Sequence, residues 1–259
     1  MSWTHIAWKE LGDTHRNRQL YGNVVALVII YGLVSFLMDG VSEGDIVTAL
    51  AMTSSIVVPV AALLVTHEVI VRRRENGQLT LLLGLAHDRR EVVLGAYVGR
   101  FVVLTIAVMA GLGTAITIAT VGESALAPHR VVGLIGFTLG FGLSYVAIGI
   151  SISTLARSTS WSAICAFVLF VLLAMAWYFV PGLARELLEL AGISYGRRPW
   201  WEPYLAGISP NVAYMTLVDA FVALDSGDSS PPVGYAVGVL AAWTLVPALA
   251  FYHFDASDL

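Results

Sequence analysis

Six long apolar runs, separated by polar segments, constrain the fold of this chain more than any other feature. Five of the six contain no Asp, Glu, Lys or Arg, and the third contains only Arg100. Runs of about 20 apolar residues are long enough to cross the hydrocarbon core of a bilayer as helices. The sequence therefore predicts an all-α, polytopic membrane protein with six transmembrane helices. The predicted spans cover residues 20–38, 46–66, 92–120, 131–156, 161–180 and 233–251.

Composition and the strength of the first run support this class. Of the 259 residues, 58% are hydrophobic and 12% are charged, whereas soluble domains carry about 25% charged residues. The first run holds eleven Leu, Ile, Val and Phe residues, which together favour insertion by roughly 5 kcal/mol. This run is longer than the apolar core of a signal peptide, and no A-x-A-like cleavage site follows Met38. We therefore interpret it as a retained span, and residues 1–259 as a single transmembrane domain.

The distribution of basic residues predicts the orientation. If the N-terminus lies inside, the inner segments hold nine of the fourteen Lys and Arg residues. Because positive charge concentrates on the cytoplasmic side of membrane proteins, we expect both termini in the cytoplasm. Residues 67–91 then form a cytoplasmic loop and residues 181–232 a long outer segment. Within the outer segment, residues 183–191 are amphipathic. Residues 212–224 are apolar but too short to span, which predicts a re-entrant or interfacial helix.

The first 19 residues have the pattern of an amphipathic helix on the membrane surface. Trp3, Ile6 and Leu11 fall on one face at helical spacing. The charged residues that lie largely opposite are Lys9, Glu10, Asp13 and Arg16. The sequence therefore predicts an N-terminal interfacial helix, with a plain anchor before the first span as the alternative.

Two pairs of glycines predict close packing between helices. Gly95 and Gly99 lie in the third run, and Gly136 and Gly140 in the fourth. Small residues four positions apart allow membrane helices to approach closely. These pairs indicate packing and no chemistry.

The patterns of catalysis and metal binding are absent from the sequence. His67-Glu68 begins like the zinc motif H-E-x-x-H, but Val71 stands where the second His would be. No G-x-S-x-G elbow is present. The only lysine is Lys9, so the phosphate-binding G-K-[ST] motif cannot occur. We therefore predict no catalytic residue, no metal site and no enzyme activity on this chain.

The spans also lack an Asp, Glu, Lys or His near their centres. An ion-coupled carrier usually keeps a titratable group at that depth. Broken helices can instead bind ions through backbone carbonyls. An ion-coupled carrier therefore remains an alternative function.

The polar segment 72–91 carries five arginines within nineteen residues. Between them, Leu79, Leu82, Leu83 and Ala86 recur at helical spacing. So short a helix is marginal alone, and it becomes rigid if its apolar face enters a groove on a soluble partner. The pattern leaves two readings open: a partner-docking helix, or a charged loop with an interfacial helix.

This segment resembles the cytoplasmic motif of ABC-2 type permeases, the membrane subunits of ATP-binding-cassette transporters. The resemblance rests on Arg74-Glu75-Asn76-Gly77-Gln78-Leu79, Leu82-Leu83, Arg89-Arg90, Val92-Val93 and Gly95, on Lys9-Glu10-Leu11, Asp13 and Arg16-Asn17-Arg18, and on Phe254, Asp258 and Leu259. Two positions depart from the family pattern. Ala86 replaces a proline, and Gly95-Ala96 replaces Gly-Lys.

The resemblance implies a permease subunit in the cell membrane of a prokaryote, driven by a separate ATPase subunit. ATP and Mg would bind to that ATPase, with no cofactor on this chain and no nucleic-acid partner. Two permease chains would pair as a homodimer or a heterodimer. The substrate stays unidentified. The alternative is a membrane subunit that passes ATP-driven movement to an extracytoplasmic partner without transport.

The resemblance also assigns roles to residues. Residues 75–88 would form a coupling helix seated in the ATPase, and Arg157 and Ser158 would make a second, smaller contact. The implied coupling residues are Glu75, Asn76, Gly77, Leu79, Leu82, Leu83, Asp88, Arg89 and Arg90. The N-terminal helix, with Lys9, Glu10, Asp13, Arg16 and Arg18, would steady that contact.

Overall fold

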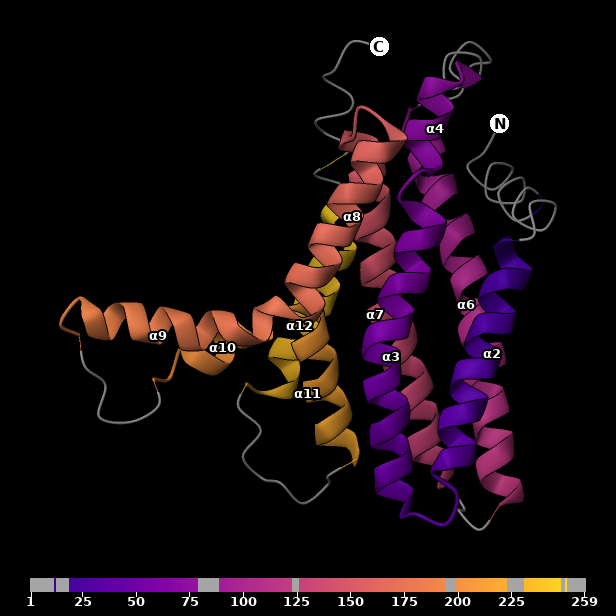
Figure 1. The fold of residues 1–259 in the computed structure, drawn as a ribbon, viewed down its shortest axis with the longest axis vertical. Helices are drawn as coiled ribbons and strands as arrows, with labels where there is room; N and C mark the ends of the chain where they lie inside the picture. Colours follow the sequence, from indigo (N-terminus) through magenta and orange to yellow (C-terminus); the bar gives the residue numbers. More distant parts are fainter. Residues whose placement is uncertain are drawn as a thin grey trace.

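The computed structural model describes residues 12, 19–78, 89–122, 126–193, 199–222, 231–247 and 250. Helices form all of the regular structure in these residues (Figure 1). The helices are α2 (Gln19–Leu37), α3 (Glu43–Thr66), α4 (Val69–Glu75), α6 (Arg89–Val121), α7 (Pro128–Leu155), α8 (Thr159–Ala174), the 3-10 helix η1 (Ala176–Phe179), α9 (Val180–Leu190), α10 (Glu202–Gly207), α11 (Pro210–Val222) and α12 (Val233–Thr244).

Four helices in the described residues are long and apolar enough to cross a membrane, and a bent pair makes a fifth if it counts as one span. The four are α2, α3 with its extension α4, α6 and α7, and they coincide with the first four predicted runs. The all-helical membrane fold is thereby confirmed. Six spans and the orientation of the termini stay predictions, and the N-terminal helix lies outside the described residues except for Gly12.

The fifth run, predicted as a span over residues 161–180, forms a bent pair of helices, so this span stays a prediction. α8 ends at Ala174, and the chain continues through η1 into α9 with a bend of 41°. The break falls at Met175, whose φ of -122° lies outside the helical range. Pro181 lies in the first turn of α9, where a proline is tolerated because the first N–H groups of a helix have no partner within it.

The first helix in the last apolar run ends before the predicted end of the span. α12 stops at Thr244, whereas the predicted span continues to residue 251. Pro247 lies three residues further on, and the same loss of an N–H ends a helix before a proline. With twelve residues α12 is a short apolar helix, so a sixth span stays a prediction.

The long helices form a bundle in which α2 lies along α6 and α3 lies along α7 (Figure 1). The closest approaches occur at glycines that the sequence did not single out. A Cβ added at Gly111 of α6 would lie 2.6 Å from the Tyr31 ring of α2. A Cβ added at Gly149 of α7 would lie 1.8 Å from Thr66 Oγ1 of α3. Both positions therefore require glycine for the helices to pack.

The predicted glycine pairs differ from each other in their surroundings. Gly95 and Gly99 are buried. At Gly136 and Gly140 an added Cβ would meet no atom within 4 Å. Close packing at the second pair therefore stays a prediction that needs another chain.

Aromatic residues with satisfied hydroxyls fill the centre of the bundle. Tyr31, Tyr145, Tyr214 and Phe141 are fully buried, and Phe141 stacks on Tyr214 with ring centroids 4.5 Å apart. The Tyr31 hydroxyl lies 2.7 Å from Ser54 Oγ. The Tyr214 hydroxyl lies 3.0 Å from Thr138 Oγ1. Buried tyrosine hydroxyls need such partners, because an unpaired polar group in an apolar interior is costly.

The helix α11 lies inside the bundle, against α3, α7 and α12. Asn211 in its first turn accepts a hydrogen bond from the Tyr145 hydroxyl and donates one of 2.6 Å to the Ser55 carbonyl. Just before it, Ser209 donates to the Leu173 carbonyl at 2.7 Å. These contacts tie α11 to α3, α7 and the end of α8.

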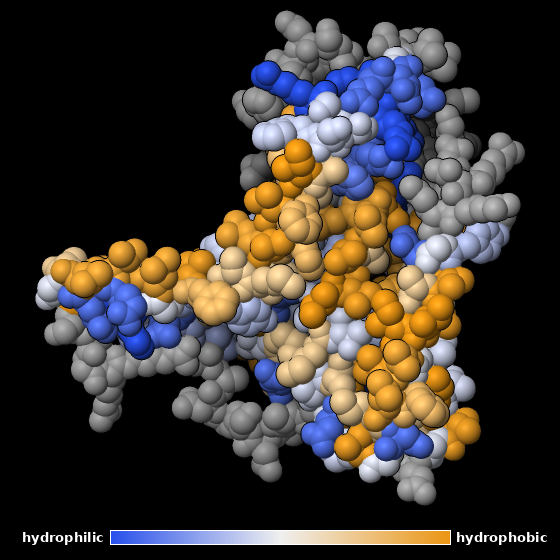
Figure 2. Space-filling model, in the orientation of Figure 1, coloured by the Kyte–Doolittle hydropathy of each residue, from blue (hydrophilic) through white to orange (hydrophobic). Residues whose placement is uncertain are grey.

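The helix α9 projects sideways from the bundle as an amphipathic arm (Figure 1). Leu183, Leu187 and Leu190 are exposed, while Arg185 pairs with Glu189 at 3.6 Å. Figure 2 shows an apolar surface along one side of the arm and a hydrophilic surface along the other. This is the distribution expected for a helix between an apolar and an aqueous phase.

Candidate functional site

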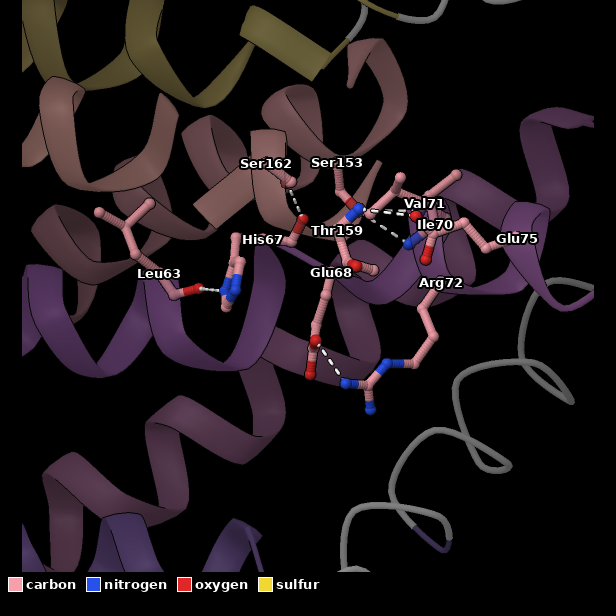
Figure 3. Close-up of polar contacts among 10 residues, drawn as sticks. All are labelled: Leu63, His67, Glu68, Ile70, Val71, Arg72, Glu75, Ser153, Thr159 and Ser162. Atoms are coloured by element: carbon pink, nitrogen blue, oxygen red, sulfur yellow. Dashed lines mark hydrogen bonds and ion pairs between the residues drawn. The ribbon is translucent and has the colours of Figure 1, made fainter. Parts of the chain in front are cut away.

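The helix α4 continues from α3 after a two-residue turn and lies at the end of the bundle where α7 ends and α8 begins (Figure 1). Three helix ends therefore meet at this point. The first N–H groups and the last C=O groups of any helix lack partners within that helix. Side chains from neighbouring elements supply these partners here (Figure 3).

Ser153 of α7 caps the start of α4. Its Oγ accepts hydrogen bonds from the backbone N–H of Ile70 at 2.9 Å and of Val71 at 3.2 Å. The hydroxyl and both of these residues are buried. Ser153 therefore takes the place of an N-cap residue, which the local sequence of α4 does not provide, since its own N-cap, Glu68, makes no side-chain cap bond.

Arg74 of α4 binds the end of α7. Its Nη1 donates to the Ala156 carbonyl and its Nη2 to the Thr154 carbonyl, each at 3.0 Å. The planar guanidinium suits two parallel bonds of this kind. The positive charge also lies at the carbonyl end of α7, where the helix dipole favours a cation.

Glu75 completes the arrangement by binding the start of α8. Its Oε1 accepts a hydrogen bond of 2.9 Å from the backbone N–H of Thr159, the first residue of α8. Ser158 caps the same helix by accepting from Trp161 N at 3.2 Å. Ser162 of α8 in turn donates to the His67 carbonyl. The loop after α3 and the loop after α7 are thus held together by side chains from both.

The end of α4 has the backbone of a glycine-terminated helix. Asn76 is the C-cap, and Gly77 follows with a φ of 69°. Helices commonly end with a residue in this left-handed region, which glycine adopts without a steric penalty. The Glu75-Asn76-Gly77 motif therefore binds α8 with its first residue and stops α4 with its last.

The structure places part of the predicted coupling set in this site. Glu75, Asn76 and Gly77 lie at the end of α4. Exposed Arg157 and half-buried Ser158 lie beside Thr159, and Arg90 lies in the first turn of α6. The remaining predicted residues lie outside the described residues: Leu79, Leu82, Leu83 and Asp88, the side chain of Arg89, and Lys9, Glu10, Asp13, Arg16 and Arg18. Their roles stay predictions.

Sequence reasoning missed Ser153 as part of this site and did not find the partners of Arg74. Nothing in the sequence distinguishes Ser153 from the other hydroxyls of the fourth run.

In the part of the chain that the structure describes, no group of three His, Cys, Asp or Glu residues could hold a metal ion. The arrangement joins helix ends, and what it can do physically is pass a displacement of one loop to the other.

These features define a multi-pass helical membrane protein whose two loops at one end form a single joined unit. The chain belongs to the ABC-2 transporter family, because the model of the ABC-2 family transporter protein matches residues 4–259. It is therefore a permease subunit of an ATP-binding-cassette transporter, a class in which a partner subunit binds ATP.

Two relatives are similar over different lengths. The chain is 27% identical over 246 residues to "Probable ABC transporter permease protein NosY" of Pseudomonas aeruginosa. The aligned stretch covers 88% of this chain and 86% of that protein. It is 31% identical over 119 residues to a protein of the same name from Stutzerimonas stutzeri. This second alignment covers 43% of this chain and 43% of that relative.

Proposed function

We propose that this permease receives ATP-driven movement through its two joined loops, 67–78 and 156–160. A separate ATPase would bind ATP and Mg and push on these loops, and this chain would need no cofactor. The observation that carries the proposal is the bonding of Arg74 and Glu75 to the backbone of the second loop. A push on α4 reaches α7 and α8 directly through these bonds.

The proposal includes the full topology. Six spans place both termini, residues 67–91 and the joined loops in the cytoplasm of a prokaryotic cell, with α9 in the outer segment. The charge distribution supports this orientation, because the arginines of α4 and those in the first turn of α6 lie at one end of the bundle. Labelling of a cysteine at Gln78 in intact cells and in inverted vesicles tests it. Labelling from outside the cell contradicts it.

We further propose that two permease chains, identical or related, enclose the transport path. The exposed Gly136 of α7 and the open surroundings of Gly140 favour a close helix contact with a second chain. Bundles of this kind switch between discrete packings and not continuously. Movement of the joined loops would select one packing over the other.

Co-purification tests the link to an ATPase. Wild-type complex from native membranes should retain an ATP-binding subunit and hydrolyse ATP. Leu82→Glu should abolish that retention, because a carboxylate on the apolar face of a docking helix opposes burial. Thr80→Glu is the matched control, since helical spacing places residue 80 on another face. Equal retention by both variants contradicts the docking role.

A second candidate function is favoured by the α9 arm. The arm extends away from the bundle (Figure 2). With its leucine face in the apolar phase, its charged side, with Arg185 and Glu189, would face a protein partner outside the cell. In that case the permease would pass movement to the partner without moving a substrate. Proteoliposomes that hydrolyse ATP but export none of the candidate substrates, and an ATPase rate that changes when the partner is added, would favour this function over transport.

A further inference from the structure

An apolar groove lies between α6 and the end of α12, at the same end of the bundle as the arginines of α4. Its volume is about 360 Å³, which lies within the range of small-molecule sites. Val93, Leu94 and Tyr97 line one wall, and Leu245 and Pro247 line the other. The exposed Leu94 and Leu245 face the groove from opposite sides.

The groove has one polar end. Its α6 wall consists of residues 90, 93, 94 and 97, which share one helix face at this spacing. Arg90 begins that face and Tyr97 lies about 10 Å further along the axis, at 1.5 Å per residue. Arg90 therefore marks the end of the groove at the polar surface, and the apolar walls extend from there toward the hydrocarbon core.

This combination selects one chemical class of occupant. An apolar groove that opens on a bilayer takes up an acyl chain, and a guanidinium at its polar end favours a phosphate. Glu91 is not part of the lining, and it is turned about 100° away on the helix. Basic pockets between membrane helices on the cytoplasmic side bind anionic headgroups. A guanidinium has five N–H donors, so a phosphate contact is compatible with other contacts of Arg90.

We propose that this groove binds an anionic glycerophospholipid, with its phosphate on Arg90 and one acyl chain between Leu94 and Leu245. The half-buried Thr244 lies at the wall beside the chain. The inference rests on the proposed orientation, which places this end of the bundle in the cytoplasm, and its test needs no ATPase. The lipid would be a fixed part of the permease beside the first loop.

Native mass spectrometry of the full-length chain tests this inference. Detergent-purified protein is equilibrated with equal amounts of phosphatidylglycerol and phosphatidylcholine, and retained lipid is counted. The wild type should retain phosphatidylglycerol in preference. Arg90→Gln should lower that retention roughly fivefold, as expected for one basic side chain at an anionic surface. Thr244→Trp should lower it further by filling the groove.

Two matched variants control for general effects. Arg72→Gln removes an exposed arginine outside the groove lining, and Ala242→Trp adds the same bulk at an exposed position on the opposite side of α12. Both should retain phosphatidylglycerol like the wild type. Equal retention of the two lipids by the wild type overturns the inference. Undiminished retention by either Arg90→Gln or Thr244→Trp, or a chain that is recovered only as a lipid-free dimer, also overturns it.

Discussion

Glu75 Oε1 accepts a hydrogen bond of 2.9 Å from the backbone N–H of Thr159, 84 residues further along the chain. Glu75 is the last residue of α4 and Thr159 the first residue of α8. The contact therefore joins the loop that follows α3 to the loop that follows α7. Because the N–H lies in the first turn of α8, where the N–H groups lack partners within the helix, a carboxylate beside it also interacts favourably with the helix dipole.

We expect Glu75→Leu to weaken ATP coupling by about fivefold, since loss of a hydrogen bond of ordinary strength corresponds to about 1 kcal/mol. Glu75→Gln should retain most of the coupling, because its amide oxygen can still accept from Thr159. The measurement is the ATPase rate of the assembled complex with and without the permease. If Leu and Gln at this position behave alike, the hydrogen bond plays no part in coupling.

Ser153→Ala should destabilise the protein by about 1–3 kcal/mol, because two buried N–H groups of α4 lose their acceptor. Thermal unfolding in detergent provides the measurement. Ser151→Ala is the control, since Ser151 donates only to the Ala147 carbonyl of its own helix, and it should cost less. A larger loss in Ser151→Ala would contradict the capping role of Ser153.

Gly77→Ala should destabilise the end of α4 by about 1 kcal/mol, because alanine disfavours the positive φ of this residue. An added Cβ meets no atom within 4 Å, so steric overlap is not the cause. Gly77→Asn should cost less, since asparagine tolerates this backbone conformation. Hydrogen exchange of the α4 amides measures the difference. Equal exchange in the Ala and Asn variants would be inconsistent with a backbone origin.

Asn211→Ala should destabilise the bundle by about 1–3 kcal/mol, because it leaves the buried Tyr145 hydroxyl and the Ser55 carbonyl without this partner. The matched control is Thr216→Val on the same helix, where the hydroxyl donates only to the Val212 carbonyl. Thermal unfolding midpoints in detergent should fall more for Asn211→Ala. Equal midpoints would contradict a stabilising role for the Asn211 bonds.

Run length and the lack of charge located α2, α3, α6 and α7, because these helices form continuous apolar segments between polar loops. The bend after α8 was missed because it falls at Met175, inside the apolar run, where neither glycine nor proline marks it in the sequence. The short helix α11 was located by its length, but its place inside the bundle depends on Asn211 and Ser209, whose partners lie far away in the sequence.

The resemblance named residues on both loops of the candidate site, with Arg157 and Ser158 on the second loop, but not the bonds that join the loops. The Glu75-Asn76-Gly77 motif and the arginine cluster located the first loop. The acceptors of Arg74 are the backbone carbonyls of Thr154 and Ala156, 80 and 82 residues away. Every residue has such a carbonyl, so the sequence cannot identify which ones accept. Ser153 has the same appearance as any hydroxyl in a membrane span. Folding was needed to bring these groups together.

The central claim is that the two joined loops move as one unit during ATP-driven coupling. A double variant, Glu75→Cys with Thr159→Cys, in a chain whose Cys165 is replaced by Ala, allows them to be linked by oxidation. The measurement is ATP hydrolysis by the assembled complex before and after linking. Since Glu75→Cys removes the acceptor of the Thr159 N–H, the reduced complex should show weakened coupling. The account predicts that linking restores ATP hydrolysis toward the wild-type rate. Loss of hydrolysis on linking, with recovery on reduction, would show that the loops must separate and would contradict the claim.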